Sequence, residues 1–288
     1  MGAPVAGRVC RPPPPRWRTS CRPHRPAVAA AAAPSTSTSS SSSTADYVAL
    51  KDVTVYRTPD GAPVPLASTF RAGPGDKTLL FVLTHGADLA PYELVPLVIK
   101  ALPRLTADAG VQVVFVVLGS PANAAAFAQR LAIPPALLFS DPTAATHDAL
   151  GFSKGFDPST PKLSPYLRLG AMLAGIGSPG TIGRVIKGYV GDAATDEIFT
   201  NSPFDVLGKG RGQRPMERAT QRLFNMGTVL AGWGELAPPD PELLTRLGGA
   251  VVLKGRETVL RHADAGILDY VDFKEACAAV GVVKALPE

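Results

Sequence analysis

The sequence predicts an α/β fold with a central mixed sheet flanked by helices. Residues 111–118 (VQVVFVVL) form a continuous apolar, β-branched run, which is typical of a strand buried on both faces. A second apolar strand is expected at residues 79–83, and a stretch with helical spacing lies between the two. Strands that alternate with helices in this way indicate parallel pairing within one sheet.

The pattern extends on both sides of these elements. In chain order, we expect strands at residues 53–56, 79–83, 111–118 and 136–139, and helices at residues 92–105, 122–131 and 144–150. Pro96 lies inside the first of these helices and should kink it. Asp141 or Thr143 can cap the third helix, and Gly151 can end it.

The C-terminal part predicts how the sheet is completed. Residues 248–253 and 258–262 have the composition of two strands, and Lys254-Gly-Arg256 forms the turn between them. A last amphipathic helix is expected at residues 272–280, with Phe273, Ala276 and Val280 on one side. A sheet closed by a β-hairpin and a final helix is the thioredoxin arrangement, so we predict a thioredoxin-like domain over residues 45–288.

An insertion at about residues 153–246 separates the two parts of this pattern. It contains two glycine-rich stretches and one convincing helix at about residues 216–233. The apolar face of that helix carries Ala219, Leu223, Met226, Val229 and Leu230, and Arg218, Gln221 and Arg222 cover the other side. The insertion is therefore expected to be largely helical.

The first 44 residues are expected to lie outside the fold. They hold six arginines, no Asp or Glu, and a Ser/Thr tract from Ser35 to Thr44. This composition is typical of a transit peptide, and its Ser, Ala and Pro content favours the chloroplast, with the stroma as the expected compartment. A mitochondrial address is the alternative, and a disordered basic tail that binds nucleic acid or membrane is the other interpretation.

Charge and hydropathy exclude some function classes. The whole chain has a formal charge of +5 and the first 44 residues contribute +6, so the remainder carries 5 − 6 = −1. The mature part has no bulk basic character, and we expect no nucleic-acid binding. No apolar run approaches the length of a membrane span.

The most informative feature lies where the strand ending near Gly86 meets the next helix. In thioredoxin-like chains this junction carries Cys-x-x-Cys, with the first cysteine at a helix N-terminus that favours thiolate. Here it reads Ala87-Asp88-Leu89-Ala90. Neither alanine can attack a disulfide or a peroxide, so the two redox positions, Ala87 and Ala90, are degenerate.

Three other residues are candidates for a site. Asp88 is interpreted as a helix N-cap, or alternatively as part of a binding pocket with His85. His85 has a pKa suited to acid–base work, but a backbone-bonded structural role is favoured because only Thr84 stands beside it. Cys277 is the one cysteine after residue 44, and a buried helical cysteine is usually inert.

The remaining motifs give no cofactor or metal site. The sequence GIGSPG at residues 175–180 matches G-x-G-x-x-G but follows a helical stretch rather than a strand. The glycine-rich residues 208–212 lack the Gly-Lys-Ser/Thr ending of a phosphate-binding P-loop. His24, His147 and His262 are scattered without metal-ligand spacing.

Several segments resemble one family, the peroxiredoxin-like 2 group of thioredoxin-fold proteins related to the AhpC/TSA antioxidant enzymes. They are Phe81-Val-Leu-Thr-His-Gly86, Leu138-Phe-Ser-Asp-Pro142, Asp148-Ala-Leu-Gly151, Leu247-Gly-Gly-Ala-Val-Val-Leu253 and His262-Ala-Asp-Ala-Gly266. Residues 213–226 look like the insertion of longer plastid members.

The resemblance implies a thioredoxin fold and thiol antioxidant chemistry, but the chain departs from the family at the site. The two cysteine positions of the family fall on Ala87 and Ala90, and its proline position falls on Asp88. The place before the hairpin, where thioredoxins hold a cis-proline, reads Gly248-Gly249, as in the family. The antioxidant chemistry therefore does not carry over residue by residue.

Three function hypotheses remain. The first is a non-catalytic binding or scaffold module for an unknown protein partner in the plastid, with the former active-site face and the inserted helix as contact surfaces. The alternative is a thiol-dependent antioxidant that uses Cys277, which requires this thiol to be exposed and acidic. The third is a non-thiol enzyme around His85, Asp88 and the glycine-rich loops.

Overall fold

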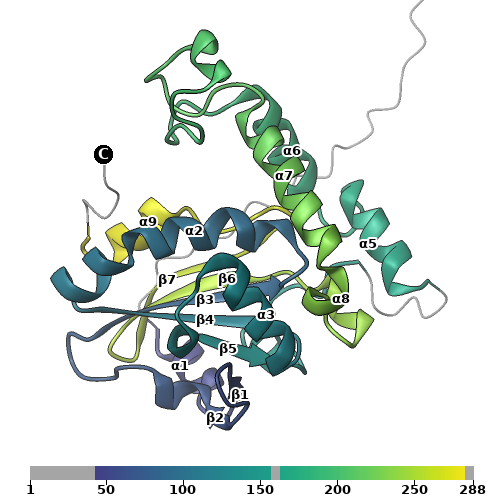
Figure 1. The fold of residues 1–288 in the computed structure, drawn as a ribbon. Helices are drawn as coiled ribbons and strands as arrows, with labels where there is room; N and C mark the ends of the chain where they lie inside the picture. The colour runs from purple at the N-terminus through teal and green to yellow at the C-terminus, as the bar shows by residue number, and fades with distance from the viewer. Residues whose placement is uncertain (1–42, 157–162, 283–288) are drawn as a thin grey trace, which may run out of the picture. The chain divides into compact units, whose positions relative to one another are not determined.

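The protein is built on one mixed sheet of seven strands in the order β2-β1-β5-β4-β3-β6-β7 (Figure 1). The computed structural model describes residues 43–156 and 163–282, so the transit peptide predicted for residues 1–44 lies almost entirely outside the described residues. The strands are β1 (Thr54–Arg57), β2 (Pro63–Pro65), β3 (Lys77–His85), β4 (Val111–Leu118), β5 (Leu138–Asp141), β6 (Gly249–Lys254) and β7 (Glu257–Ala263).

The strand pairing confirms the predicted topology. Strands β3, β4 and β5 are parallel to one another, and the hairpin β6–β7 adds to β3 in antiparallel orientation. The predicted strand at residues 111–118 is β4, which lies in the middle of the sheet and is flanked on both sides. This is the thioredoxin-like arrangement expected from the sequence.

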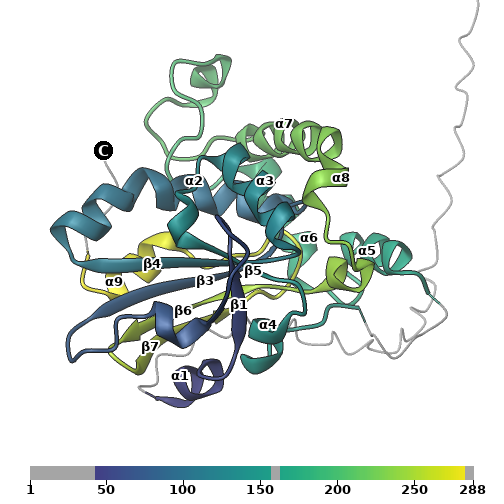
Figure 2. The ribbon, with the colours of Figure 1, turned by 60° about the horizontal axis from the view of Figure 1, so that its bottom comes forward.

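Helices cover both faces of the sheet (Figure 2). The α-helices are α1 (Ala45–Leu50), α2 (Leu89–Pro103), α3 (Pro121–Leu131), α4 (Ala145–Ala149), α5 (Pro165–Leu173), α6 (Gly180–Val190), α7 (Glu217–Ala231), α8 (Trp233–Leu236) and α9 (Phe273–Ala279). Helices α2, α3 and α9 pack on one face, and α1 and α4 pack on the other. Within the described residues, no helix combines the length and the apolar character that crossing a membrane requires.

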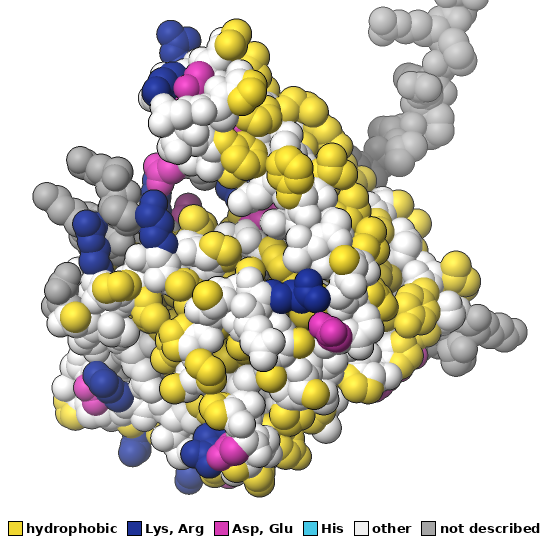
Figure 3. Space-filling view, viewed as in Figure 1, with side chains coloured by type: hydrophobic (Ala, Val, Ile, Leu, Met, Phe, Trp, Pro, Cys, Tyr) yellow, Lys and Arg dark blue, Asp and Glu magenta, His cyan; other side chains and the backbone are white. Residues whose placement is uncertain are grey.

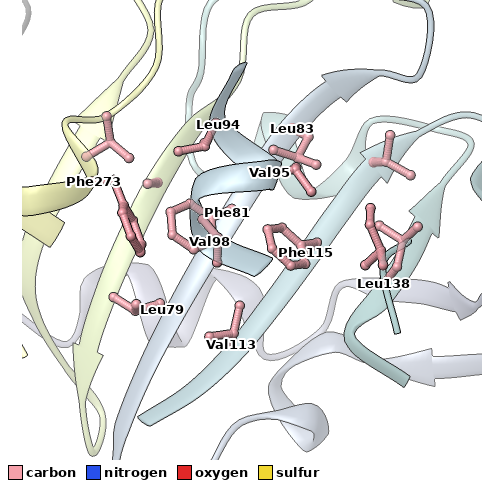
Figure 4. Close-up of a cluster of buried hydrophobic side chains, with 14 of the residues drawn as sticks. Leu79, Phe81, Leu83, Leu94, Val95, Val98, Val113, Phe115, Leu138 and Phe273 are labelled. Atoms are coloured by element: carbon pink, nitrogen blue, oxygen red, sulfur yellow. The ribbon is translucent and has the colours of Figure 1, made fainter. Parts of the chain in front are cut away.

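The alternation of side chains along β3 explains the two layers. Leu79, Phe81 and Leu83 point toward α2, whereas Leu80 and Val82 belong to the cluster on the opposite face. Figure 4 shows the first cluster, in which the rings of Phe81 and Phe115 stack with centroids 5.4 Å apart. Phe273, predicted on the buried side of the last helix, lies in the same cluster.

Strand β2 and helix α6 are among the elements that were not predicted from the sequence. Residues 63–65 form the edge strand β2, although two of its three residues are prolines that lack an N–H group. An edge strand tolerates proline because one side of it needs no partner. Helix α6 contains glycines at positions 180, 183 and 188, which have low helix propensity, so local sequence favoured a loop.

The predicted helix at residues 216–233 is present as α7, with part of its apolar face turned to solvent. Leu223, Met226 and Leu230 are exposed, and Val229 is buried. Arg222 instead turns toward the body of the protein. The amphipathic pattern correctly indicated a helix, and the structure shows that most of its apolar face is exposed.

Candidate functional site at the start of helix α2

Asp88 caps the helix that begins at the junction. Its Oδ1 accepts a hydrogen bond from the Leu89 backbone N–H (2.6 Å), and its Oδ2 accepts one from the Thr84 hydroxyl (2.7 Å). The Asp88 backbone N–H donates to the His85 carbonyl (3.0 Å). Both carboxylate oxygens are therefore occupied in holding the turn between β3 and α2.

The two degenerate redox positions are covered. Ala87 is 7% exposed and Ala90 is 5% exposed. Segments of the insertion lie against the junction: a Cβ on Gly86 would stand 3.3 Å from the Leu236 carbonyl, and Leu89 packs with a cluster that includes Met172. The insertion thus lies against Gly86 and Leu89, and the buried Ala87 and Ala90 are not themselves available to a partner.

His85 is buried and is held by the main chain. Burial lowers the pKa of His85, while the charge of Asp88 and a hydrogen bond with the Leu244 carbonyl oppose that shift. Its Nδ1 has no hydrogen-bond partner within the described part of the chain. The hydroxyl of the preceding residue, Thr84, already donates to Asp88. The geometry gives His85 a neutral ring anchored to the backbone.

A buried histidine–aspartate pair lies behind the junction. His262 Nε2 stands 3.3 Å from Asp264 Oδ1, and both side chains are almost fully buried. Burial, with the charges of Asp269 and Asp88, raises the pKa of Asp264 to about 6, although His262 opposes the rise. Burial lowers the pKa of His262, but the adjacent Asp264 carboxylate outweighs it, so the net shift is upward.

Sequence spacing offers no reason to place His262 near the junction. The residue lies in β7, and Asp264 follows the end of that strand. The fold brings Asp264 next to Gly248, where a Cβ would stand 3.1 Å from Asp264 Oδ2. Asp264 also lines a cavity of about 10 Å³ together with Thr84 and Ala90, which is the space of roughly one water molecule.

A larger cleft of about 490 Å³ lies between α2, α9 and the insertion. Its size falls in the range of small-molecule sites, which is about 300–1,000 Å³. Its wall carries charges of both signs, contributed by elements that are far apart in the sequence. They include Glu93 of α2, Arg184 of α6, Arg218 and Arg222 of α7, and Lys274 of α9.

Glu93 contacts several of these charged groups, and the sequence analysis did not identify it as a site residue. Its buried carboxylate accepts from Arg222 Nε (2.6 Å) and from the Tyr270 hydroxyl (2.9 Å), and Arg218 approaches to 3.5 Å. Burial and the neighbouring Glu93 charge raise the pKa of Tyr270, so this hydroxyl stays protonated as a donor. The cluster sets one carboxylate against two guanidinium groups, and it fastens the insertion to α2.

Cys277 does not meet the conditions for a reactive thiol. It lies in the core cluster beneath α2. Burial, together with the charge of Asp272, raises the pKa of Cys277 to about 11. The alternative hypothesis required an exposed and acidic thiol, and the structure shows a buried and weakly acidic one.

The glycine-rich stretch at residues 175–180 is a joint within the fold. Ser178 Oγ and Thr181 Oγ1 both accept from the Ile267 N–H, at 2.9 and 3.0 Å. Gly175 and Gly177 have φ values of +85° and +71°, which the tight turn requires. The motif therefore joins α6 to the segment after β7.

The second glycine-rich stretch, residues 208–212, binds to carboxylates of its own loop. The Gly210 N–H donates to the Glu197 carboxylate, and Lys209 lies 3.8 Å from Asp205. Among the described residues, no group of three or more His, Cys, Asp or Glu side chains is placed to hold a metal ion.

The comparison with protein families identifies the chain. A family model described as AhpC/TSA antioxidant enzyme matches residues 98–266, which is more than half of the sequence. The chain belongs to this peroxiredoxin-like, thioredoxin-type family. Among curated proteins, none matches the chain.

The position of the match is informative about this AhpC/TSA family member. The matched region begins at residue 98, in the second half of α2, and it runs to the segment after β7. It includes the insertion and the hairpin but not the junction at residues 84–90. The match therefore establishes the family and the fold without bearing on the residues that would carry thiol chemistry.

Proposed function

We propose that this AhpC/TSA family member is a plastid protein that binds a partner and performs no thiol chemistry. The observation that carries the proposal is the junction itself, where alanines occupy both redox positions and both alanines are buried. Thiol antioxidant activity needs an accessible thiolate, and Cys277 is buried with a raised pKa.

The decisive experiment is peroxide consumption by the full chain with a thioredoxin or glutathione recycling system. Cys10 and Cys21 are replaced by serine so that they cannot contribute thiols of their own. This protein is compared with the same protein carrying Cys277→Ser. We expect no turnover above the buffer in either. Turnover that disappears with Cys277→Ser would overturn the proposal and establish a one-cysteine antioxidant.

A second experiment asks whether the junction lacks only its two cysteines or has also become inaccessible to a disulfide substrate. We expect Ala87→Cys with Ala90→Cys to fold but to show no disulfide reductase activity, because both positions are buried. The matched control is the double substitution Ala87→Ser with Ala90→Ser, which introduces similar volume without thiols. Reductase activity in the cysteine variant alone would show that partner disulfides reach the junction.

The plastid address belongs to the same proposal. Its support is the composition of residues 1–44, with six arginines and no acidic residue. A full-chain fluorescent fusion should enter chloroplasts and accumulate in the stroma, while a fusion that begins at residue 45 should stay outside. Accumulation of the full-chain fusion in mitochondria would replace the plastid assignment with the alternative address.

A further inference from the structure

The cleft of about 490 Å³ between α2, α9 and the insertion has the size of a small-molecule site. Figure 3 shows the surface hollowed between the body and the loop that joins α6 to α7, with basic and acidic side chains around the hollow. Part of the wall is apolar and consists of Pro96, Leu97, Leu268 and Phe273. A wall of this kind suits a ligand that has both an apolar part and a polar group.

Two arginines of α7 reach the buried Glu93 carboxylate, and only one of them is fully engaged. Arg222 donates to both carboxylate oxygens, from Nε at 2.6 Å and from Nη2 at 3.3 Å, and its Nη1 donates to the Arg184 carbonyl. Arg218 approaches Glu93 only to 3.5 Å, and its side chain is 14% exposed. One carboxylate cannot neutralise two guanidinium groups, so the positive charge of Arg218 remains available to the cleft that it lines.

The two glutamines beside Arg218 turn their oxygens toward it. Arg218 Nε donates to Gln213 Oε1 (3.2 Å), and Arg218 Nη1 donates to Gln221 Oε1 (3.1 Å). An arginine can only donate, so each glutamine faces it with the carbonyl oxygen. Both glutamine NH₂ groups and Arg218 Nη2 have no partner within the described part of the chain, and all three side chains line the cleft. This corner therefore offers a positive charge and unused donors, which are the features that bind an oxyanion.

Two lysines add positive charge to the same cleft. Lys100 of α2 and Lys187 of α6 line it and are exposed, and among the described residues neither has an ion-pair partner. The charged side chains that line the cleft are six basic and five acidic residues, a formal excess of 6 − 5 = +1. The cleft as a whole therefore favours an anion.

The acidic residues of the wall are held by groups other than Arg218 and the two lysines. Asp196 and Glu197 lie in ion pairs with other cations, and Glu93 is bound by Arg222 and Tyr270. Asp192 and Asp272 each accept a hydrogen bond from the backbone N–H two positions further along the chain. Arg218, Lys100 and Lys187 thus remain as the cations that a ligand can meet.

We propose that this cleft binds a small phosphate ester, with the phosphate group at Arg218, Gln213 and Gln221 and the organic part against the apolar wall. A phosphate ester presents three strong acceptor oxygens, which matches unused donors on three side chains, whereas a carboxylate presents two oxygens in one plane. Phosphate also carries close to two negative charges at pH 7. Lys100 and Lys187 supply the additional positive charge. Binding of a phosphate ester is separate from the proposed partner function and does not depend on it.

The test titrates the full chain with phenyl phosphate, benzoate and inorganic phosphate by isothermal titration calorimetry. Phenyl phosphate and benzoate share a ring and differ in the anionic group, and inorganic phosphate lacks the ring. The first variant is Gln221→Glu, which keeps an oxygen for Arg218 and replaces the unused NH₂ group by a carboxylate oxygen. Its matched control is Gln129→Glu, the same change at an exposed position of α3 outside the cleft.

The second variant is Lys187→Met, which removes an exposed side chain and so leaves the fold intact. Its matched control is Lys254→Met, at an exposed position at the end of β6. Melting temperatures of all variants separate a loss of binding from a loss of structure. The controls are needed because the arginine-rich first 44 residues can bind phosphate by themselves.

We expect phenyl phosphate to bind more tightly than inorganic phosphate, because its ring contacts the apolar wall, and more tightly than benzoate. Gln221→Glu should weaken the binding of phenyl phosphate at least about tenfold, because a negative charge then faces the phosphate. Lys187→Met should weaken it about threefold, as expected for an exposed charge. The two control variants should bind as the unchanged protein does.

Three results would overturn the phosphate-ester site. The first is the absence of saturable binding of phenyl phosphate by the unchanged protein. The second is equal affinity of each variant and its matched control, since the anion would then bind elsewhere in the chain. The third is tighter binding of benzoate than of phenyl phosphate, since the cleft would then be a carboxylate site. Peroxide turnover tests the proposed function separately.

Discussion

Arg222 of α7 and Glu93 of α2 form an ion pair with Nε and Oε1 2.6 Å apart, and the Glu93 carboxylate is fully buried. The pair joins the insertion to the first helix after the redox junction. Arg222 also donates from its guanidinium to the Arg184 carbonyl (2.9 Å), which links α7 to α6. The insertion is thus fastened to the thioredoxin-like body in part through charge, while Leu223, Phe224 and Leu230 of α7 stay exposed.

Removing the arginine should therefore be costly. We expect Arg222→Met to lower the free energy of unfolding by about 2 to 4 kcal/mol, because a buried carboxylate loses its closest partner while Arg218 keeps part of the compensation. Urea denaturation of the full chain measures the change.

The matched control is Arg57→Met, which breaks a surface pair with Asp60 whose side chains are about half exposed. That change should cost less than about 1 kcal/mol. Equal effects of the two substitutions would show that the Glu93 pair does not fasten the insertion.

The sequence predicted the body of the fold well because the pattern of apolar residues along a strand shows which of its faces are buried. Residues 111–118 could only be a central strand, and they are β4. The Glu93 cluster could not be predicted, since its partners lie 129 and 177 positions away along the chain. The amphipathic pattern of α7 indicates two faces but not which one is buried. Burial of the arginine side depends on Glu93, a carboxylate of α2 that lies far away in the sequence.

At Gly249, the first residue of β6, the backbone lies very close to β7 and to the ring of Phe152. A Cβ there would overlap the His262 carbonyl and lie 2.6 Å from Phe152 Cζ. We expect Gly249→Ala to lower the free energy of unfolding by about 1 to 3 kcal/mol, because the strand and the ring must shift.

The glycine control is Gly227→Ala in the interior of α7, where an added Cβ meets nothing within 4 Å. Alanine is the better helix former there, and we expect a gain of about 0.5 to 1 kcal/mol. Thermal and urea unfolding of both variants provide the measurement, and a stabilised Gly249→Ala protein would contradict the close approach.

The buried pair His262–Asp264 should make stability depend on pH. The pKa of Asp264 rises from 3.8 to about 6 in the folded state, so this group lowers the free energy of unfolding as pH rises from about 4 to 6. The pKa of His262 is also raised, so its contribution is complete below pH 6.5 and is lost as pH rises through its folded pKa. Both effects have the same sign.

The comparison that isolates them uses His262→Gln with Asp264→Asn. Relative to this double variant, the unchanged protein should lose stability between pH 4 and pH 8, as measured by urea denaturation at several pH values. His85 and His147 have lowered pKa values and act in the opposite direction, but they are present in both proteins and cancel. A stability difference that stays constant with pH would refute the assignment.

Cys277 offers a direct check on the absence of thiol chemistry. A pKa of about 11 leaves about one thiol in a thousand ionised at pH 8, and burial keeps reagents away from that fraction. In the Cys10→Ser, Cys21→Ser protein we expect iodoacetamide to label Cys277 at least about a hundredfold more slowly in buffer than in urea. Mass spectrometry of quenched samples measures the rates.

The internal control is the same protein with Phe224→Cys. Phe224 is exposed, so a thiol at this position should react at similar rates in both solvents. Rapid labelling of Cys277 in the folded protein would restore the one-cysteine antioxidant as the leading function, because accessibility and acidity are the two properties that the buried position denies it.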